Sequence, residues 1–581
     1  MEVQEVENNL YENKAGKIWE EYSKMKEYQD SMDFRTDFPE IIRFKEGDQW
    51  PAPTQKTKNF PRPVFNITEM FIRNKRAAVT NQNMEISYVP LEVDENEEMR
   101  ATAEQGARAY SEFSKVQWEN VDQNTLNNEF VDDAITLGTG LLHYYWDDNI
   151  TGGGTLKYIG DLAGEIIDVL NFGVANPREK NIQKQEALIL ESRKTIRQVQ
   201  ELAKKEGITG YMYDLIKPDN YDALYDSDKK VKDDDEVTVL TKYFRKNGEV
   251  YYSKSTHNVM LIDDRSLTPT VSDEEAVENE EAIVTAEPAK ITLYPVVVLT
   301  YKNRKKSFYG IGEAQDIIPI NKLYNQLKGM MALNVIRTGN PNILIKKKAL
   351  TQTLTNEGGQ QIIDNYEGGG DRIKYMQPPN FSNEFSKISA EIFDMARTLT
   401  GNTDVSTGEV LGANMAASAI IALQNQAKTP IKEFQQKFFS AMKEVGDIWC
   451  QFYKTYYSTA RNISVENDGE VETETFRGTD YAGTDFKTRV EVTVSSDKES
   501  LSMSVLENMK AAGDITKEQY VELAPDSAIP FKAKLKEMWG KTSQEKMLLA
   551  QAMEQIKAYR QMLGQGGAQN EVQTMPNGNV Y

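Results

Sequence analysis

Residues 415–459, MAASAIIALQNQAKTPIKEFQQKFFSAMKEVGDIWCQFYKTYYST, form the longest helical pattern in the chain and decide the fold. Apolar side chains recur there at steps of three and four, the period of one helix face. The members of this stripe are Ile431, Phe434, Phe438, Met442, Val445, Trp449, Phe452 and Tyr456. The pattern predicts a helix from about Met415 to Thr459, roughly 65 Å long at 1.5 Å per residue, with a kink at Pro430. We interpret the stripe as a core face.

Upstream of this helix, two shorter helices are predicted to bracket a small insertion. The first is Ile311–Arg337, whose apolar stripe consists of Ile320, Leu323, Tyr324, Leu327, Met330 and Met331. The second is Phe381–Leu399. The insertion between them contains two short strand patterns and a basic triplet, namely Ile343–Ile345, Ile373–Met376 and Lys346-Lys347-Lys348. Such helices cannot cover both faces within one subunit, so lateral packing against copies of the chain is expected.

The rest of the chain mixes helices and strands, which predicts an α+β fold, mainly helical, with roughly three to four domains. The predicted helices are Asn9–Met32, largely exposed; one N-capped by Asn66; Glu98–Leu137 with a break near Asn120; Thr195–Glu206; and the region Ser504–Leu563. The predicted strands are Leu141–Trp146, Glu165–Val169, Tyr294–Leu299, the hairpin of Val237–Arg245 with Val250–Ser253, and the region Asn462–Val494. Residues 273–281 predict an acidic surface loop, and 564–581 a disordered tail.

Composition limits the kind of protein that this can be. The 581 residues are 39% hydrophobic and 27% charged, which is typical of a folded globular protein. No apolar run approaches the ~20 residues that span a bilayer. The single cysteine, Cys450, excludes an intrachain disulfide and fits a reducing compartment. The net charge of -21 argues against tight gripping of nucleic acid, but it is compatible with a conduit through which a duplex slides.

Candidate catalytic and phosphate-binding patterns are weak. Only two histidines, His143 and His257, could act as general bases, and both lie in predicted strands without a nucleophile motif nearby. The segments Gly138-Thr139-Gly140 and Gly310-Ile311-Gly312 lack the rest of a dinucleotide or P-loop motif and are interpreted as turns. We therefore expect no enzyme, no metal and no cofactor. A carboxylate-dependent hydrolase using Asp132 and Asp133 stays open as an alternative.

Several short motifs agree in order and spacing with those of a known family. They are Gly47-Asp48-Gln49-Trp50 with Arg62-Pro63-Val64-Phe65-Asn66; Gly173–Pro177; Tyr309-Gly310-Ile311-Gly312-Glu313 with Asn321 and Asn325; and Thr400-Gly401 with Val405-Ser406-Thr407-Gly408 and Ser418-Ala419-Ile420. Together with the order of helices and insertion, they make the chain resemble the portal proteins of tailed bacteriophages, most of all the P22-like group, over about Tyr11–Thr459.

The resemblance implies a division into named parts. They would be a wing (1–310), a stem helix (311–339), a clip (340–379), a second stem helix (380–400), a tunnel loop (401–414), a long kinked helix with a β return to the wing (415–503), a crown (504–563) and the tail (564–581). The tunnel loop would face the DNA channel through Asn402, Asp404, Ser406, Glu409 and Asn414. The clip would contact partners or DNA through Lys346, Lys347, Lys348, Arg372 and Lys374.

The resemblance also implies a function. The subunits would form a ring, a dodecamer in this family, at one capsid vertex, through which double-stranded DNA is packaged and ejected. The expected partners are further copies of the chain, terminase, head–tail adaptor proteins, and the major capsid and scaffold proteins, with no membrane involved. The expected location is the portal vertex of the virion, and the host cytoplasm during assembly. A different phage head–tail assembly protein, such as an adaptor, stays open as an alternative.

Overall fold

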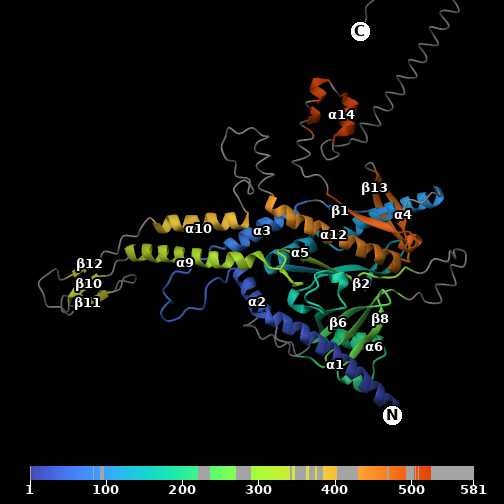
Figure 1. The fold of residues 1–581 in the computed structure, drawn as a ribbon, viewed down its shortest axis with the longest axis horizontal. Coiled ribbons are helices and arrows are strands. Elements are labelled where there is room, and N and C mark those ends of the chain that lie inside the picture. The colour runs from blue at the N-terminus through green and yellow to red at the C-terminus, as the bar shows by residue number, and fades with distance from the viewer. Residues whose placement is uncertain are drawn as a thin grey trace, which may run out of the picture. The chain divides into compact units, whose positions relative to one another are not determined.

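The structure is a computed structural model with two compact units. It describes residues 2–82, 84–91, 97–219, 236–269, 289–339, 343–346, 361–364, 373–375, 384–401, 429–467, 470–492 and 503–524, the last without 504, 508 and 514. The first unit comprises Met1–Ile463 and Thr475–Val492, and the second Ser464–Glu474 and Thr493–Tyr581. No helix of the described residues is long and apolar enough to cross a membrane. The predicted mixture of helices and strands is confirmed (Figure 1).

The chain opens with helices α1 (Glu2–Ser31) and α2 (Phe34–Lys45), separated by a turn at Asp33 with φ of 59°. The prediction of a largely exposed first helix is wrong for its second half. There, Ile18 and Tyr22 pack on the buried side chains of Ile189 and Leu240. Lys26 is also buried and forms an ion pair with Glu191, while its amine donates to the carbonyl of Leu170. Polar side chains hold much of this helix in place, which an apolar stripe does not reveal.

Helix α3 (Ile67–Thr80) has Asn66 as its N-cap, because the Asn66 side chain accepts from the Glu69 amide, as predicted. Helices α4 (Glu97–Asn120) and α5 (Gln123–Leu137) replace the single broken helix that was predicted, with the break at the expected place.

Strand β1 (Met84–Pro90) pairs antiparallel with β15 (Phe486–Val492), about four hundred residues later in the chain.

Two antiparallel sheets build the N-terminal part. The first has the order β3-β2-β9, from Tyr158–Ile166, Thr139–Gly152 and Val296–Thr300. The second has the order β4-β5-β6-β7-β8, from Phe172–Val174, Ala187–Thr195, Glu236–Lys246, Glu249–Ser255 and Met260–Ser266. The β6–β7 hairpin is confirmed, and its turn residues Asn247 and Gly248 have φ of 55° and 83°, as a two-residue hairpin turn requires. Helices α6 (Ile196–Lys205) and α7 (Tyr211–Asp214) follow β5.

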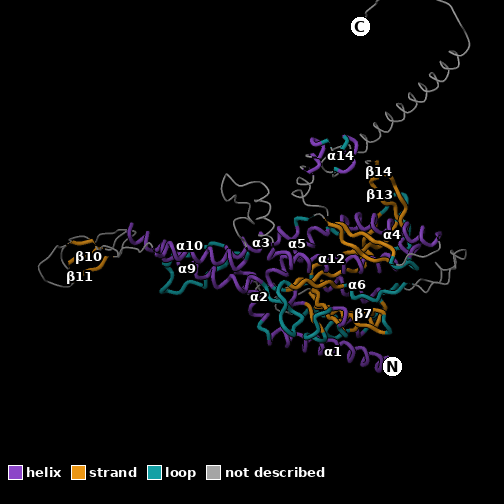
Figure 2. Tube along the Cα trace, turned by 45° about the horizontal axis from the view of Figure 1, so that its top comes forward, coloured by secondary structure: helices purple, strands orange, loops and turns teal. Residues whose placement is uncertain are grey.

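Helices α9 (Glu313–Gly339) and α10 (Glu384–Thr400) lie side by side and run in opposite directions (Figure 1). Three short strands are inserted between them in the chain: β10 (Ile343–Lys346), β11 (Gln361–Asp364) and β12 (Ile373–Tyr375). They form one sheet, with β10 parallel to β11 and antiparallel to β12, at the end of the helix pair (Figure 2). The predicted pair of strands is confirmed, and β11 was missed.

Helix α12 (Thr429–Tyr456) carries the stripe from which the fold was predicted. All its members from Ile431 to Phe452 are buried, so the interpretation as a core face is confirmed. Trp449 lies against Tyr144 of β2, with ring centroids 5.8 Å apart. Pro430 is the second residue of the described helix, so the residues before it that would form a kink are not described. The predicted segment 415–428 lies outside the described residues.

The remaining strands are β13 (Arg461–Asn467) and β14 (Glu470–Phe476), which pair with each other. With β15 they confirm the predicted β region. In the second unit, helix α14 (Lys517–Leu523) begins with a capping box of Thr516 and Gln519. Most of the predicted helical region 504–563, the acidic segment 273–281 and the tail 564–581 lie outside the described residues.

Candidate functional site

Residues from two of the motifs quoted above come together where α9 joins the rest of the first unit. Four side chains there are almost fully buried although polar: Gln49 from the loop after α2, Thr68 from α3, and Asn321 and Asn325 from α9. Asn321 and Asn325 are one helical turn apart, so they project from the same face. We call these four residues with Asn66 the polar joint.

Every amide of the polar joint is hydrogen-bonded. The Asn321 carbonyl accepts from the amide of Thr68 at 3.0 Å, and its amino group donates to the carbonyl of Phe65 at 2.9 Å. The Asn325 carbonyl accepts from the amide of Phe65 at 3.0 Å. Its amino group donates to the Gln49 carbonyl at 2.6 Å. The Gln49 amino group in turn donates to Asn66 at 2.9 Å and to the carbonyl of Phe44 at 3.1 Å.

These bonds fix α9 to a backbone segment and not only to other side chains. The Thr68 amide lies in the first turn of α3, where no carbonyl of the helix can accept from it, so Asn321 supplies the missing acceptor. A buried polar group without a partner would cost about 1–3 kcal/mol. The polar joint therefore stabilises one rotation of α9 about its axis and one position of α9 along that axis, relative to α3.

A buried ion pair ties the same two helices together about two turns further along. The Lys75 amine of α3 donates to both carboxylate oxygens of Glu313, at 2.5 and 2.6 Å, and to the Tyr301 hydroxyl at 2.9 Å. Burial lowers the pKa of Lys75, and the nearby Glu313 carboxylate partly opposes this effect. Glu313 is the first residue of α9, where a negative charge also favours the helix dipole.

The glycines that were interpreted as turns allow two backbones to touch. Gly138 ends α5 with φ of 95°, and the segment containing Gly310 and Gly312 passes directly over this turn. A Cβ on Gly312 would lie 2.2 Å from the carbonyl of Thr136, and one on Gly310 would lie 2.2 Å from that of Gly138. Only glycine fits this crossing, which positions the start of α9.

The carboxylate pair of the hydrolase alternative lies close by and is engaged in ion pairs. Asp132 accepts from Arg76 at 2.8 Å and also pairs with Lys45. Burial, together with the charge of Asp132, raises the pKa of Asp133 to about 7. The structure thus gives Asp132 a structural role between α2, α3 and α5.

The histidines also have structural surroundings. His143 lies in a strand, as predicted; it is buried in β2, within 2.8 Å of Glu165 and 3.0 Å of the Tyr243 hydroxyl. His257 is exposed and lies in the turn after β7, not in a strand. Among the described residues, no group of three or more His, Cys, Asp and Glu side chains could hold a metal ion.

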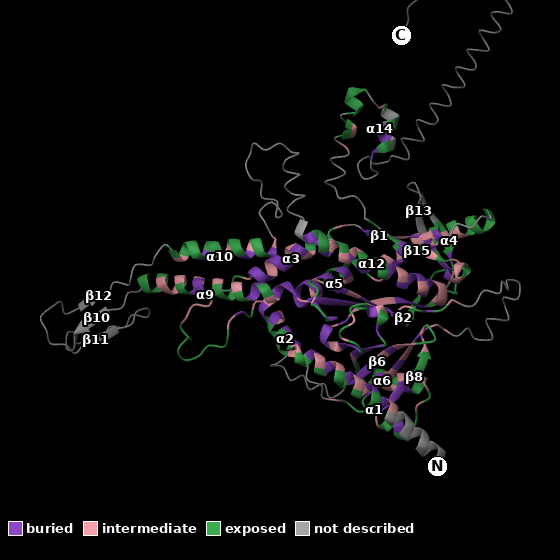
Figure 3. Cartoon of the chain, in the orientation of Figure 1, coloured by how far each residue is buried: buried purple, intermediate pink, exposed green. Residues whose placement is uncertain are grey.

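The parts of α9 and α10 that point away from the rest of the unit expose large apolar side chains among charged and polar ones. Near the polar joint, Ile317 of α9 and Ala396 of α10 pack with Ile67 and Phe71 of α3 in one core cluster. Further along the pair, exposed side chains predominate (Figure 3). The large apolar side chains exposed on the two helices are Leu323, Met330, Val335, Ile336, Ile388, Met395 and Leu399. The predicted stripe on the first stem helix is thus only partly buried in the subunit.

The predicted site residues themselves are mostly beyond what the structure describes. The tunnel-loop residues Asn402, Asp404, Ser406, Glu409 and Asn414 lie outside the described residues, as do Lys347, Lys348 and Arg372. Lys346 ends β10 and Lys374 is the middle residue of β12, where it pairs with Leu344. The two lysines are thus on neighbouring strands of one small sheet.

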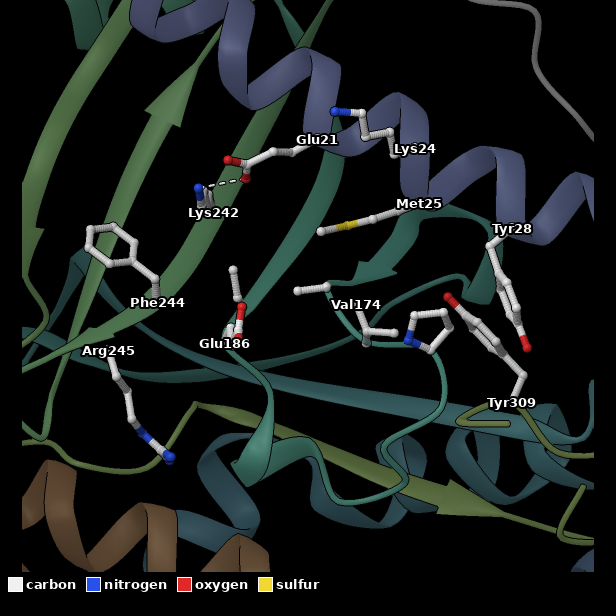
Figure 4. Close-up of a pocket in the computed structure, with 13 residues that line it drawn as sticks. Glu21, Lys24, Met25, Tyr28, Val174, Glu186, Lys242, Phe244, Arg245 and Tyr309 are labelled. Carbon is white, nitrogen blue, oxygen red and sulfur yellow. Dashed lines mark hydrogen bonds and ion pairs between the residues drawn. The ribbon is translucent and has the colours of Figure 1, made fainter. Parts of the chain in front are cut away.

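A pocket of about 440 Å³ lies between α1, β4 and β6 (Figure 4). Its charged side chains have partners: Lys242 binds Glu21 at 2.6 Å, and Lys24 binds Glu20 at 2.9 Å. Arg245 donates to the backbone carbonyl of Thr292 and stacks on Tyr294. The cationic side chains of this pocket therefore already bind groups of the same fold.

The described fold defines a structural α+β protein in which a long helix pair, with a small sheet inserted, is anchored to its body by a polar joint. Its sequence from residue 226 to residue 578 matches the phage P22-like portal protein. The chain belongs to this portal protein family.

Solved structures give a weaker similarity. One chain from the neck of an empty GTA particle is 10% identical with a TM-score of 0.35, and the alignment covers 84% of this chain and 94% of that one. A chain from the virion of a native gene transfer agent particle is 10% identical with a TM-score of 0.34, over 84% and 93%. No curated protein matches the sequence.

Proposed function

We propose that the chain is the portal subunit of a phage particle. Copies of it form a ring at one capsid vertex, and double-stranded DNA is packaged and ejected through the channel of this ring. The ring docks terminase during packaging and head–tail connector proteins afterwards. Membership of the portal family supports this proposal, and no enzyme activity is part of it.

The observation that carries the assembly step is the apolar surface of α9 and α10. Seven large apolar side chains are exposed on two adjacent helices, including Val335 at 70% and Met395 at 62%. Monomeric soluble proteins rarely leave large apolar patches uncovered, and these seven side chains lie on two adjacent helices. Because the base of the pair is fixed by the polar joint, neighbouring copies can cover these side chains in a repeated head-to-tail contact.

In this proposal, α9 and α10 are the stem, the sheet β10-β11-β12 with Lys346 and Lys374 belongs to the clip, and residues 401–414 form the tunnel loop. The clip lysines then contact terminase, connector proteins or DNA. Residues 1–310 form the wing, which the β strands after α12 complete, and 504–563 form the crown.

The assembly step is tested with the full chain by negative-stain imaging and native mass spectrometry. We expect rings from the unaltered protein and loss of rings from a Val335→Asp, Met395→Asp variant. Ile159→Asp is the matched control, because Ile159 is 74% exposed but lies on β3. Only monomers or dimers of the unaltered protein would contradict the proposal, as would rings from the double variant.

A further inference from the structure

A cationic patch lies on the first unit, away from the polar joint. Two loops build it: 176–180, which follows β4, and 302–306, which follows β9. The amide of Phe308 donates to the carbonyl of Pro177 at 2.7 Å, so the two loops are held against each other although they are far apart in sequence. The cationic patch consists of Arg178, Lys180, Arg304, Lys305 and Lys306.

Both loops have a defined conformation. In the first, the side chain of Asn176 accepts from the amide of Arg178 at 3.1 Å, and the side chain of Gln185 donates to the carbonyl of Asn176 at 2.9 Å. In the second, Lys306 has φ of 55°, and Arg304 lies over the ring of Phe34 at 5.7 Å. The cations are thus presented on a prepared surface, which reduces the entropy lost on binding.

The exposed cations of the cationic patch form no ion pair with a described carboxylate, and Glu179 between Arg178 and Lys180 instead accepts from the Asn181 amide. These exposed cations are Arg178, Lys180, Lys305 and Lys306. The neighbouring Lys302 differs, because it binds Asp316 at 2.7 Å. In a chain with a net charge of -21, a local group of unpaired cations indicates an anionic partner.

The other exposed groups of the two loops indicate what kind of anion this is. Exposed neighbours are polar, such as Asn176 and Asn303, whereas Phe308 and Tyr309 are buried. None of the large apolar side chains exposed on the described surface belongs to either loop. Protein interfaces contain apolar or aromatic anchors, while interfaces with nucleic acids are polar and strongly positive. The composition favours a phosphate backbone over an acidic protein.

We propose that the cationic patch binds the phosphate backbone of double-stranded DNA, without reading its sequence. Phosphate contacts by Lys and Arg release counterions, so binding of this kind weakens steeply with salt. The choice of duplex DNA rests on the proposed portal function, but the contact lies on other residues than the predicted tunnel loop and clip. The proposal adds a second DNA contact, on the body of the subunit.

The test measures binding of a fluorescently labelled 30-base-pair duplex to the full chain by anisotropy, from about 50 to 200 mM NaCl. Two double variants, Arg178→Gln, Lys180→Gln and Lys305→Gln, Lys306→Gln, remove half of the exposed cations each. Lys56→Gln, Lys58→Gln is the matched control, because these two lysines are equally exposed but lie in the loop between α2 and α3.

We expect each patch variant to reduce the slope of log affinity against log salt by about 1.8, which is 0.9 for each lost contact. The control is expected to keep the slope of the unaltered protein. Equal effects of all three variants, or no binding of duplex by the unaltered protein at 50 mM NaCl, would overturn the proposal. Ring formation by the same samples is measured separately, so loss of the DNA contact leaves the proposed portal function standing.

Discussion

The Asn321→Leu substitution tests whether the polar joint holds α9 in place. Leucine has the same number and branching of side-chain heavy atoms but cannot accept from the Thr68 amide or donate to the Phe65 carbonyl, which Asn321 reaches at 3.0 and 2.9 Å. Asn321 is fully buried, so water cannot replace these partners. Each unpaired group costs about 1–3 kcal/mol, which gives about 3 kcal/mol as a moderate sum for the two.

Hydrogen exchange of the full chain, followed by mass spectrometry, measures this loss locally. At 1.4 kcal/mol for each factor of ten, about 3 kcal/mol corresponds to a roughly hundredfold faster exchange of the Thr68 amide. The Phe65 amide, bonded to Asn325, is expected to exchange faster as well. Gln326→Leu is the control, because Gln326 is exposed on the same helix. The reasoning is refuted if both variants leave the peptide around Phe65 and Thr68 equally protected.

Three further changes test other parts of the site. Gly312→Ala places a Cβ 2.2 Å from the Thr136 carbonyl, so the free energy of unfolding, measured by thermal melting, is expected to fall by about 1–3 kcal/mol. Gly16→Ala is the control, because open space surrounds Gly16 and no loss of unfolding free energy is expected. Burial and the charge of Asp132 raise the pKa of Asp133 to about 7, so the folded state keeps this proton longer than the unfolded state, and stability falls as pH rises from about 4 to 7. Asp133→Asn is neutral at every pH. Its melting temperature is therefore expected to be about 2–4 °C above that of the unaltered protein at pH 8 and equal to it at pH 4. Equal melting temperatures at both pH values would contradict the assignment. Replacing Lys346, Lys347 and Lys348 by alanine is expected to leave rings intact but lower the DNA retained per particle or the docking of partners, and unchanged packaging and infectivity would argue against the clip assignment.

The sequence was sufficient wherever a local pattern determines the structure. The stripe of α12 predicted a buried face because its large apolar side chains recur at helical spacing over 28 residues. The Asn247-Gly248 turn predicted the β6–β7 hairpin because both residues tolerate positive φ. The Asn66 cap was also predictable from a local pattern, because the Glu69 amide that it binds is only three residues away.

Predictions failed where the partner of a residue is distant in sequence. The buried side of α1 includes Lys26, whose burial depends on Glu191 and on a carbonyl of the segment before β4. The pairing of β1 with β15 joins opposite ends of the first unit and has no local signal. Asn321 and Asn325 were noticed as motif residues, but nothing near them in the sequence identifies Gln49 or Phe65 as their partners.

The exposed end of α9 agrees with the prediction that one subunit cannot cover both faces of this helix. Leu323 and Met330 belong to a regular apolar stripe, yet they are 47% and 44% exposed in the isolated subunit. The periodicity of apolar residues predicts that a helix face is buried. It does not predict whether the same chain or another chain buries it. In the proposed ring the stripe is covered by a neighbouring copy, and the sequence pattern describes the assembled state.

The chemistry of the polar joint suits such an assembly better than an apolar contact would. Apolar side chains in contact can slide or rotate at little cost, whereas the amides of Asn321 and Asn325 bind only when donors and acceptors are aligned. In a closed ring every interface repeats the same rotation, so an error in the direction of α9 would recur in each subunit and prevent closure. A buried network that allows one direction of α9 therefore meets a geometric requirement of ring assembly, and this explains why hydrogen-bonding side chains occupy a position that burial alone would assign to leucine or valine.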